Sequence, residues 1–487
     1  MKILFVTSEA YPLIKTGGLA DVSGSLPVAL RNNRQDVRLL MPAYHDALEQ
    51  AGELHAVATV AMAGSTQPIR ILEGVLPGTR VKVWLVDYPP AFNRPGNPYM
   101  TLQGDPWPDN AQRFALLSRV AVEIAQNRVD LRWQPDVVHC HDWQTALVPA
   151  LLSLEPSRPA TVFTIHNLSY QGIYDSTTFV HLNLPTALWH PDGLEYYGKL
   201  NIIKGGLAYA DIITTVSPTY AEEIQTYEFG YGLEGLLGHR RDRLHGILNG
   251  IDYEKWNPAQ DPRLKKPYTV RNLDDKEENK KQLRKDFNLS QKKDLVLIGM
   301  ITRLVEQKGI DLILDAMPRL IQFPVQFVIL GGGDSRFEWA LGEWAKLYPD
   351  RIGLRIGYDE TLAHHIEAGA DIFLMPSRFE PCGLNQMYSQ RYGTVPIVRR
   401  VGGLADSVVD ATDENIAQGT ATGIIFDHAD ANAVCWAVER ALTLYRDFRV
   451  WRGMMRAGMR QAFDWKTSAG KYIEVYEEAV RLAALRP

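Results

Sequence analysis

The feature that most constrains the fold is a series of short, continuous apolar runs that alternate with helical patterns along the chain. In the first half these runs read KILFVTS, DVRLLMP, VKVWLVD, DVVHCHD, TVFTIHN and DIITTVS; in the second half they read DLVLIGMI, VQFVILGGGD, RIGLRIG, DIFLMPS and TVPIVRR. Strands that are apolar on both faces belong in parallel sheets covered by helices on both sides. The sequence therefore predicts an α/β protein with doubly wound parallel sheets.

The length of the chain indicates two domains. Its 487 residues exceed the roughly 250 to 300 at which a single hydrophobic core stops growing. Residues 252–289 are rich in Lys, Asp, Glu, Asn and Pro and poor in apolar residues, which marks a domain boundary or a surface excursion. We place the domain junction near residues 245–255.

Composition and charge exclude several classes of partner. The formal net charge of −5 argues against nucleic acid or a membrane surface, because such partners draw a basic face. The three cysteines, Cys140, Cys382 and Cys435, are widely spaced, which fits a reducing compartment. The start MKILFVTSEA is too short in its apolar run for a signal peptide or a membrane span, so we expect a cytoplasmic protein.

The first predicted strand leads into a glycine pair beside a lysine. In open α/β sheets, ligands bind beyond the carboxyl ends of the strands, and KTGGLADV places Lys15, Gly17 and Gly18 there, before a helix. Glycines let the backbone approach an anion, and the helix N-terminus adds its dipole. A tight turn with a solvated lysine explains the same letters. The pentapeptide GGLAD returns at residues 402–406, either as a second ligand loop or by coincidence.

Two further strand ends carry an imidazole next to another polar group. His141 and Asp142 follow DVVHC, and His166 and Asn167 follow TVFT. They converge only if these strands are neighbours, and a buried, satisfied histidine is the plainer interpretation. A metal bound by His139, His141 and His166 is disfavoured because no helix-spaced histidine pair accompanies a carboxylate. We therefore expect no metal and no cofactor.

The second half places two cations and a carboxylate at strand ends. Arg303 and Lys308 lie in the turn after DLVLIGMI, and Glu380 follows DIFLMPS just before a predicted helix start. The residues at that helix start are Cys382, Gly383, Leu384 and Asn385. Amides at a helix start bind phosphate, and the carboxylate suits a sugar hydroxyl. A structural ion pair is the alternative, and we favour a functional role because of the placement.

Two patterns point away from other chemistries. GYGLEG at residues 230–235 matches GxGxxG but follows a helical pattern, whereas a dinucleotide fingerprint follows a strand. No Asp-x-Asp triplet occurs, so Arg, Lys and amides would have to meet the charge of a diphosphate. The irregular stretch at residues 92–110 carries Tyr99 and Trp107; it is either a sugar-binding loop or a surface flap.

Together these motifs resemble one known family. KTGGLADV, HDWQT, HNLSYQG, NGIDYEKWNP, GMITRLVEQKGIDL and EPCGLNQMYSQRYGTVPIVRRVGGLADSV are similar, in family order along nearly the whole chain, to the bacterial glycogen synthases and plant starch synthases. The resemblance implies a GT-B architecture with two Rossmann-like domains facing across a cleft. It divides the chain into residues 1–250, completed by a terminal helix at 465–487, and residues 251–464.

The resemblance also implies a reaction and a role for each site residue. The reaction is metal-independent transfer of glucose from ADP-glucose to the non-reducing end of an α-1,4-glucan, with retained configuration and no cofactor. Lys15, Gly17 and Gly18 would contact the phosphates and sugar of the donor, and Asp21 would support their loop. Asp142 and His166 would contact the transferred glucose. Arg303 and Lys308 would neutralise the leaving diphosphate, and Glu380 would bind the sugar. Tyr358 would lie by the adenine, Asn249 would lie beside the donor, and Tyr99 would contact the glucan. A cradle for sugar and phosphate would be formed by the backbone amides of Cys382, Gly383, Leu384 and Asn385.

Retention is compatible with two routes, a covalent glycosyl-enzyme or attack from the face that ADP leaves. No carboxylate nucleophile is marked out, so we favour the same-face route. Three rival functions stay open: a GT-B transferase with a small acceptor, a non-catalytic sugar-nucleotide sensor, and a nicotinamide dehydrogenase.

Overall fold

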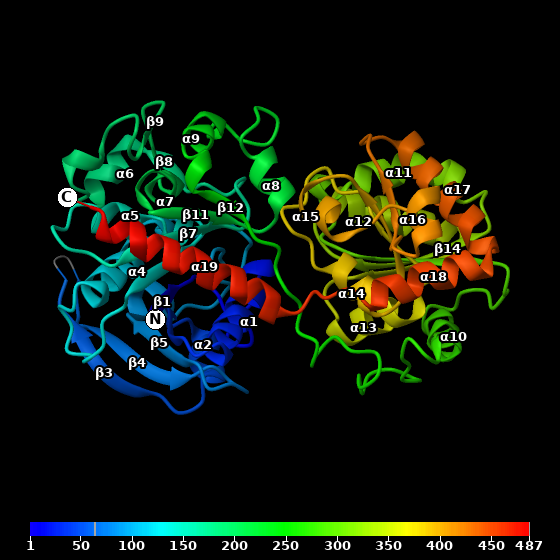
Figure 1. The fold of residues 1–487 in the computed structure, drawn as a ribbon, viewed down its shortest axis with the longest axis horizontal. Helices are drawn as coiled ribbons and strands as arrows, with labels where there is room; N and C mark the ends of the chain where they lie inside the picture. The colour runs from blue at the N-terminus through cyan, green and yellow to red at the C-terminus, as the bar shows by residue number, and fades with distance from the viewer. Residues whose placement is uncertain (63–64, 487) are drawn as a thin grey trace. The chain divides into compact units, whose positions relative to one another are not determined.

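A computed structural model describes residues 1–62 and 65–486. The chain divides into two compact units, one formed by Met1–Gly250 with Trp465–Pro487 and the other by Ile251–Asp464. The chain colours in Figure 1 distinguish them: blue to green with the red terminal helix in the first unit, and green to orange in the second. Among the described residues, no helix is long and apolar enough to cross a membrane.

The first unit is built on a mainly parallel sheet. Within the described residues the strand order is β12-β11-β7-β6-β1-β2-β5-β4-β3. The seven parallel strands are β1 (Lys2–Val6), β2 (Asp36–Pro42), β5 (Lys82–Asp87), β6 (Val137–His141), β7 (Ala160–Ile165), β11 (Ile212–Thr215) and β12 (Leu244–Gly246). The apolar runs that predicted parallel strands are therefore strands, and most of their residues are buried.

One edge of this sheet was not predicted. Strands β3 (His55–Val60) and β4 (Ile69–Val75) run antiparallel, and β4 pairs antiparallel with β5. Their faces differ in burial, since β3 is mostly exposed, so no continuous apolar run signals them. A small separate sheet contains β8 (Ile173–Asp175), β10 (Lys199–Asn201) and β9 (Glu195–Tyr196).

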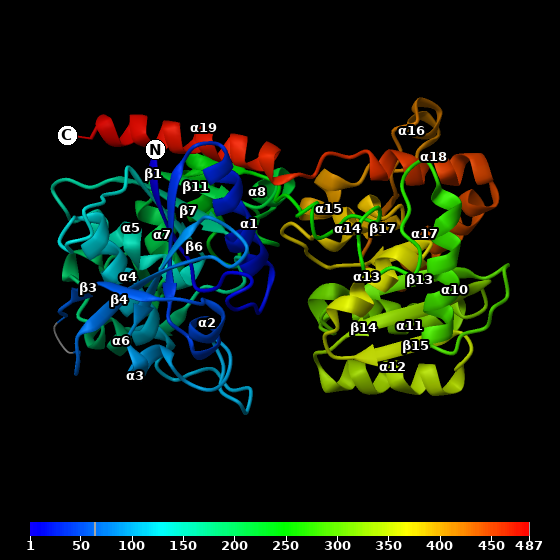
Figure 2. The same cartoon turned by 90° about the horizontal axis from the view of Figure 1, so that it is seen from below.

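Helices of the first unit surround this sheet. They are α1 (Gly18–Asn32), α2 (His45–Gln50), α3 (Pro89–Phe92), α4 (Asn110–Ala125), α5 (Leu147–Leu152), α6 (Ser176–His181), α7 (Ile203–Tyr209), α8 (Pro218–Glu223), α9 (Glu234–His239) and α19 (Trp465–Ala484). Figures 1 and 2 both show α19 beside α1. Tyr476 of α19 bonds the ring of the buried His139 (2.8 Å), and Ser468 donates to the carbonyl of Leu248 (2.7 Å). The chain terminus thus completes the first core.

The second unit contains a fully parallel sheet in the order β15-β14-β13-β16-β17-β18. Its strands are β13 (Val296–Ile301), β14 (Val325–Gly331), β15 (Ile352–Ile356), β16 (Ile372–Met375), β17 (Val395–Arg399) and β18 (Ile424–Phe426). The helices are α10 (Lys276–Asp286), α11 (Ile310–Leu320), α12 (Ser335–Leu347), α13 (Glu360–Gly369), α14 (Asn385–Arg391), α15 (Gly402–Ser407), α16 (Asp413–Gln418), α17 (Ala431–Arg446) and α18 (Phe448–Met459).

Both faces of the second sheet are covered, as a doubly wound fold requires. Ile298 and Phe327 on one face pack in a core with α11, α12 and α17. On the other face Gly299 lies against Ile366 of α13. Because the strands run parallel, the turns that follow them emerge at the same carboxyl edge of the sheet. Ligands bind at this edge in such folds.

The charged stretch after the domain junction is not a surface excursion. Its helix α10 buries three cations, Lys276, Lys280 and Arg284. Lys276 donates to the carbonyl of Glu367 (3.1 Å) and to two further oxygens, and Lys280 pairs with Asp371 (2.6 Å). Long cationic side chains can be buried when their nitrogen atoms find such partners. Composition marked the boundary but could not show this packing.

Candidate active site

The loop after β1 carries the first predicted ligand residues. Lys15 Nζ donates to Asp21 Oδ1 at 2.8 Å, and both side chains are partly exposed. Gly17 has an extended backbone and Gly18 begins α1. A Cβ added to either glycine would meet no heavy atom within 4 Å. Neither conformation nor packing inside the first unit therefore requires glycine at these two positions, which are exposed.

Glu9 anchors this loop through hydrogen bonds, and it was not identified as a candidate residue in the sequence analysis. Its carboxylate accepts the backbone N–H of Thr16 (2.6 Å), the Thr16 hydroxyl (2.9 Å) and the N–H of Gly17 (3.3 Å). The hydroxyl of Tyr99 donates to the same group at 2.9 Å. Glu9 is 3% exposed, and burial raises its pKa. It follows β1 at the carboxyl edge, so the rule that selected the other site residues could have found it.

Asp142 and His166 are brought together because β6 and β7 are neighbours. Asp142 Oδ1 accepts the backbone N–H of His166 at 2.7 Å. The backbone of Asp142 has φ 55° and ψ −179°, a combination that is strained for any residue except glycine and that clusters at functional sites. Burial raises the pKa of Asp142 to about 7. The carboxyl group is therefore poised to change charge near neutral pH.

The histidines of these strand ends lie in a row, in which His139 and His141 are buried and His166 is half-buried. His141 Nδ1 and His166 Nε2 are 2.9 Å apart, and burial lowers the pKa of His166 to about 3. His139 is satisfied by Tyr476 and by Thr164. Within residues 1–62 and 65–486 no cluster of three His, Cys, Asp or Glu side chains could hold a metal ion. His166 is thus a neutral hydrogen-bonding group beside Asp142.

In the second unit, Lys308 and Glu380 meet at the carboxyl edge of the sheet. Lys308 Nζ lies 2.5 Å from Glu380 Oε2, and the Ser377 hydroxyl donates to the same oxygen at 3.0 Å. Arg303 Nη2 donates to Gln307 at 3.2 Å, one turn before α11. Glu380 is 6% exposed. The ion pair that sequence reasoning weighed as a structural alternative therefore exists, and it brings together the cation and carboxylate expected to act on a donor.

The second GGLAD segment supports Glu380. Gly402 has a φ of 41°, and a Cβ there would lie 2.0 Å from the carbonyl oxygen of Glu380. Gly403 donates its N–H to that oxygen at 3.1 Å, and its own Cβ would lie 2.1 Å from the carbonyl oxygen of Cys382. Both glycines are buried. This copy packs against the loop backbone and is not itself an exposed ligand loop.

The four residues predicted as an amide cradle lie directly after Glu380. Cys382 is buried, and Gly383 has a left-handed φ of 70°. Leu384 precedes α14, which begins at Asn385. The side-chain amide of Asn385 (Nδ2) donates to the backbone carbonyl of Ile301 at 2.6 Å. This bond ties the start of α14 to the end of β13, the strand that leads to Arg303.

The remaining predicted residues lie in three places. Tyr358 follows β15 and is 72% exposed, with its hydroxyl 3.4 Å from Glu360. Asn249 is buried in the first unit, and its amide oxygen has no hydrogen-bond partner among the described residues. Tyr99 is half-buried, and its hydroxyl also bonds the Ser8 hydroxyl at 2.7 Å. Its ring lies against that of Phe114, with the ring centroids 6.0 Å apart.

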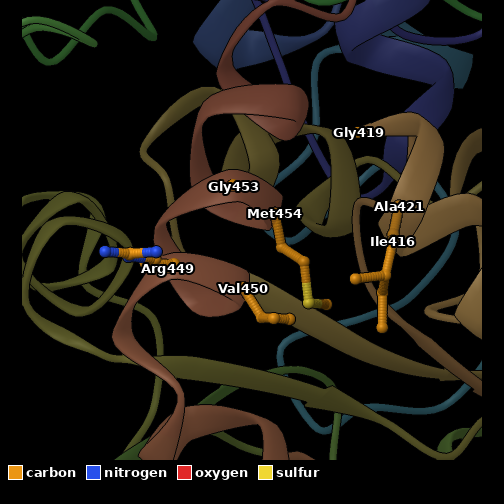
Figure 3. Close-up of a pocket in the computed structure, with 7 residues that line it drawn as sticks. All are labelled: Ile416, Gly419, Ala421, Arg449, Val450, Gly453 and Met454. Carbon is orange, nitrogen blue, oxygen red and sulfur yellow. The ribbon is translucent and has the colours of Figure 1, made fainter.

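Two other features do not belong to this site. A cavity of about 240 Å³ in the second unit is lined by α16, α18 and the turns beside α16, where Ile416, Val450 and Met454 point toward one another and Arg449 points away (Figure 3). No predicted site residue lines it. The glycine pattern at residues 230–235 comes after helix α8 and not after a strand, so it lacks the context of a dinucleotide site.

Comparisons with known proteins define the class first. Residues 2–239 match the starch synthase catalytic domain family, and residues 279–452 match glycosyl transferases group 1. The catalytic domain of starch synthase IV from Arabidopsis thaliana, bound to ADP and acarbose, superposes with a TM-score of 0.89 at 35% identity, covering 98% of this chain and 99% of that one. The two Rossmann-like units therefore define a glycosyltransferase of the GT-B class.

Full-length relatives are more specific. Glycogen synthase 1 of Methylococcus capsulatus is 57% identical over 99% of this chain and 97% of its own length. The glycogen synthase of Thioalkalivibrio sulfidiphilus is 52% identical over 99% of this chain and 100% of its own length. The chain belongs to the glycogen synthase family and is a glycosyltransferase of glycogen synthesis. A sucrose-phosphate synthase from Thermosynechococcus elongatus, at 16% identity and a TM-score of 0.58, shares the fold alone.

Proposed function

We propose that this enzyme transfers glucose from ADP-glucose to the non-reducing end of an α-1,4-glucan, with retained configuration and without a metal ion. The observation that carries the proposal is the Lys308–Glu380 pair at the carboxyl edge of the second sheet, in which Lys308 is partly buried and Glu380 is buried. The starch synthase IV structure, which has the same fold, holds ADP and acarbose. A nucleoside diphosphate donor and a glucan acceptor fit this combination of residues.

The chemistry divides between leaving group and sugar. Breaking the bond between glucose C1 and the diphosphate builds negative charge on the leaving oxygens and positive charge on the ring. We assign the first charge to Arg303 and Lys308, because preorganised cations stabilise developing charge without reorganisation. We assign a glucose hydroxyl to Glu380, whose carboxylate is held in place by Lys308 and Ser377.

We assign contacts with the transferred glucose to two groups of the first unit. Asp142 is a half-buried carboxyl group with a raised pKa, and His166 is a neutral hydrogen-bonding ring. In the same-face route, the acceptor hydroxyl oxygen bonds to C1 while the C1–phosphate bond breaks on that face. The acceptor proton passes to the departing phosphate oxygen, so configuration is retained and no enzyme nucleophile is consumed.

Incorporation of labelled glucose into glycogen tests the proposal, with ADP-glucose and UDP-glucose compared in excess chelator. We expect transfer from ADP-glucose in chelator. Preference for UDP-glucose would overturn the donor, loss of transfer in chelator would overturn metal independence, and transfer only to small acceptors would overturn the polymer. Glu380→Gln should lose roughly a hundredfold to a thousandfold in kcat, whereas Glu343→Gln, on the exposed face of α12, should not.

A further inference from the structure

Two loops that are far apart in the sequence meet at one buried carboxylate. Glu9 receives three hydrogen bonds from the loop at residues 15–17 and one from Tyr99, which lies in the loop at residues 92–110. The donors are neutral amides and hydroxyls, and Glu9 is 3% exposed. A buried carboxylate usually has a cationic partner or another reason to be present, since burial of its charge is costly.

We propose that Glu9 is a positioning residue: it fixes the loop at residues 15–17 for the donor and, through Tyr99, couples that loop to the loop at residues 92–110. That the loop at residues 15–17 binds a donor rests on the proposed function, whereas the coupling between the two loops does not. Bonds from the backbone of Thr16 and Gly17 set the path of the glycine loop, whose exposed face carries Lys15. The hydroxyl of Tyr99 makes the position of the second loop depend on the first.

The second loop is itself anchored at Tyr99 and Trp107. Trp107 Nε1 donates to the carbonyl of Asn97 at 3.2 Å, and its ring lies against the guanidinium groups of Arg94 and Arg113. Asn110 at the start of α4 donates to the carbonyl of Tyr99 at 3.0 Å. The loop is thus a folded unit with its own bonds, and the hydroxyl of Tyr99 joins it to Glu9 and to Ser8.

Hydrogen exchange measured by mass spectrometry on the full chain tests the coupling without any substrate. Tyr99→Phe keeps the ring and deletes the bond, so peptides covering both loops should exchange faster. Tyr227→Phe, at a side chain 91% exposed, is the matched control and should change neither loop. If Tyr99→Phe affects only residues 92–110, the coupling is wrong, whatever the enzyme's substrate proves to be.

Kinetics then test the positioning role. Glu9→Gln keeps the size of the side chain but removes the charge that its four donors share. Hydrogen bonds to charged groups are the stronger kind, so the KM for ADP-glucose should rise about tenfold or more. Its melting temperature should stay close to that of the wild type, because the variant also removes a buried charge. Glu53→Gln, 85% exposed, is the control. A lowered melting temperature with unchanged KM would mean a purely structural role and would overturn the proposal.

A double-mutant cycle separates positioning from two independent losses. If Glu9 and Tyr99 act through one bond, the double variant should lose less than the product of the single losses in kcat/KM. Simple multiplication of the two effects would contradict the coupling. If the wild type transfers nothing from ADP-glucose, the proposed function fails, and the exchange experiment alone decides the inference.

Discussion

The pentapeptide GGLAD occurs twice, at residues 17–21 and 402–406, and each copy lies between a strand and the helix that follows it. In the first copy the glycines are exposed, and a Cβ at either would touch nothing within 4 Å. In the second copy both are buried, and a Cβ would collide with the backbone of Glu380 or Cys382. The same letters thus form an exposed loop in one unit and a packed support for the backbone of Glu380 in the other.

The comparison teaches that a glycine has more than one reason to be present. A glycine needed for packing shows it in the structure, through a close neighbour or a left-handed φ. A glycine needed for a ligand shows neither, because the atom that requires it belongs to another molecule. The first copy is of this second kind under our proposal, and the predictions below test that difference.

The largest effect is expected for Gly403→Ala. Its Cβ would meet the backbone of Cys382 at 2.1 Å, so the loop that carries Glu380 must shift. Overpacking of this kind destabilises by about 1 to 3 kcal/mol, and displacing Glu380 should lower kcat by roughly a hundredfold. Thermal unfolding and glucose transfer measure the two losses. Wild-type kinetics in a stable Gly403→Ala protein would show that the second copy does not position Glu380.

A smaller and purely functional effect is expected for Gly18→Ala in the first copy. No neighbour within 4 Å opposes the added methyl group, and alanine favours the helix α1 that begins here. The melting temperature should be unchanged or raised, while the KM for ADP-glucose rises about tenfold, the equivalent of one good hydrogen bond. Unaltered KM would mean that no ligand approaches this glycine, and the contrast between the copies would lose its functional meaning.

Asp142 tests whether a candidate site residue of the first unit is held at a cost to stability. Burial raises its pKa from 3.8 to about 7, so between these values the folded state binds more protons than the unfolded state. The free energy of unfolding therefore falls as pH rises through this window, and the loss is complete above about pH 7. Asp142→Asn removes this dependence.

Denaturant unfolding of wild type and Asp142→Asn at about pH 5 and about pH 8 measures the effect. The free energy of unfolding of Asp142→Asn minus that of the wild type should increase by about 2 kcal/mol from about pH 5 to about pH 8. Asp46→Asn, an exposed residue of α2, is the control and should show no such change. A difference between wild type and Asp142→Asn that stays constant with pH would mean that the carboxyl is charged throughout.

The smallest effect on stability is expected for Lys15→Met. The ion pair with Asp21 is partly exposed, and such pairs contribute about 0 to 1 kcal/mol. The melting temperature should hardly move, yet turnover should fall because the cation next to the first glycine pair is lost. Lys466→Met, on an exposed residue of α19, controls for a general charge effect. Equal activity of the two variants would remove Lys15 from the mechanism.

The sequence alone determined the two α/β units and the strand ends at which most of the candidate site residues lie. Continuous apolar runs that alternate with helical patterns are typical of parallel sheets covered on both faces, and residues directly after such strands lie at one edge of the sheet. This logic places Asp142 and His166 at the carboxyl edge of the first sheet, and Arg303, Lys308 and Glu380 at that of the second. It failed for the antiparallel strands β3 and β4, whose residues carry no strong periodicity, and for helix α10, whose buried lysines look like surface residues.

Only the tertiary structure decided what each group does to its neighbours. Glu9 owes its role to hydrogen bonds from residues 7 and 90 positions away, and the pKa of Asp142 to burial that no local pattern encodes. The two GGLAD copies make the point most directly, since identical glycines are exposed in one copy and buried in the other. Local sequence sets backbone preference, whereas packing against distant segments sets burial and contact, and these distinguish the two copies.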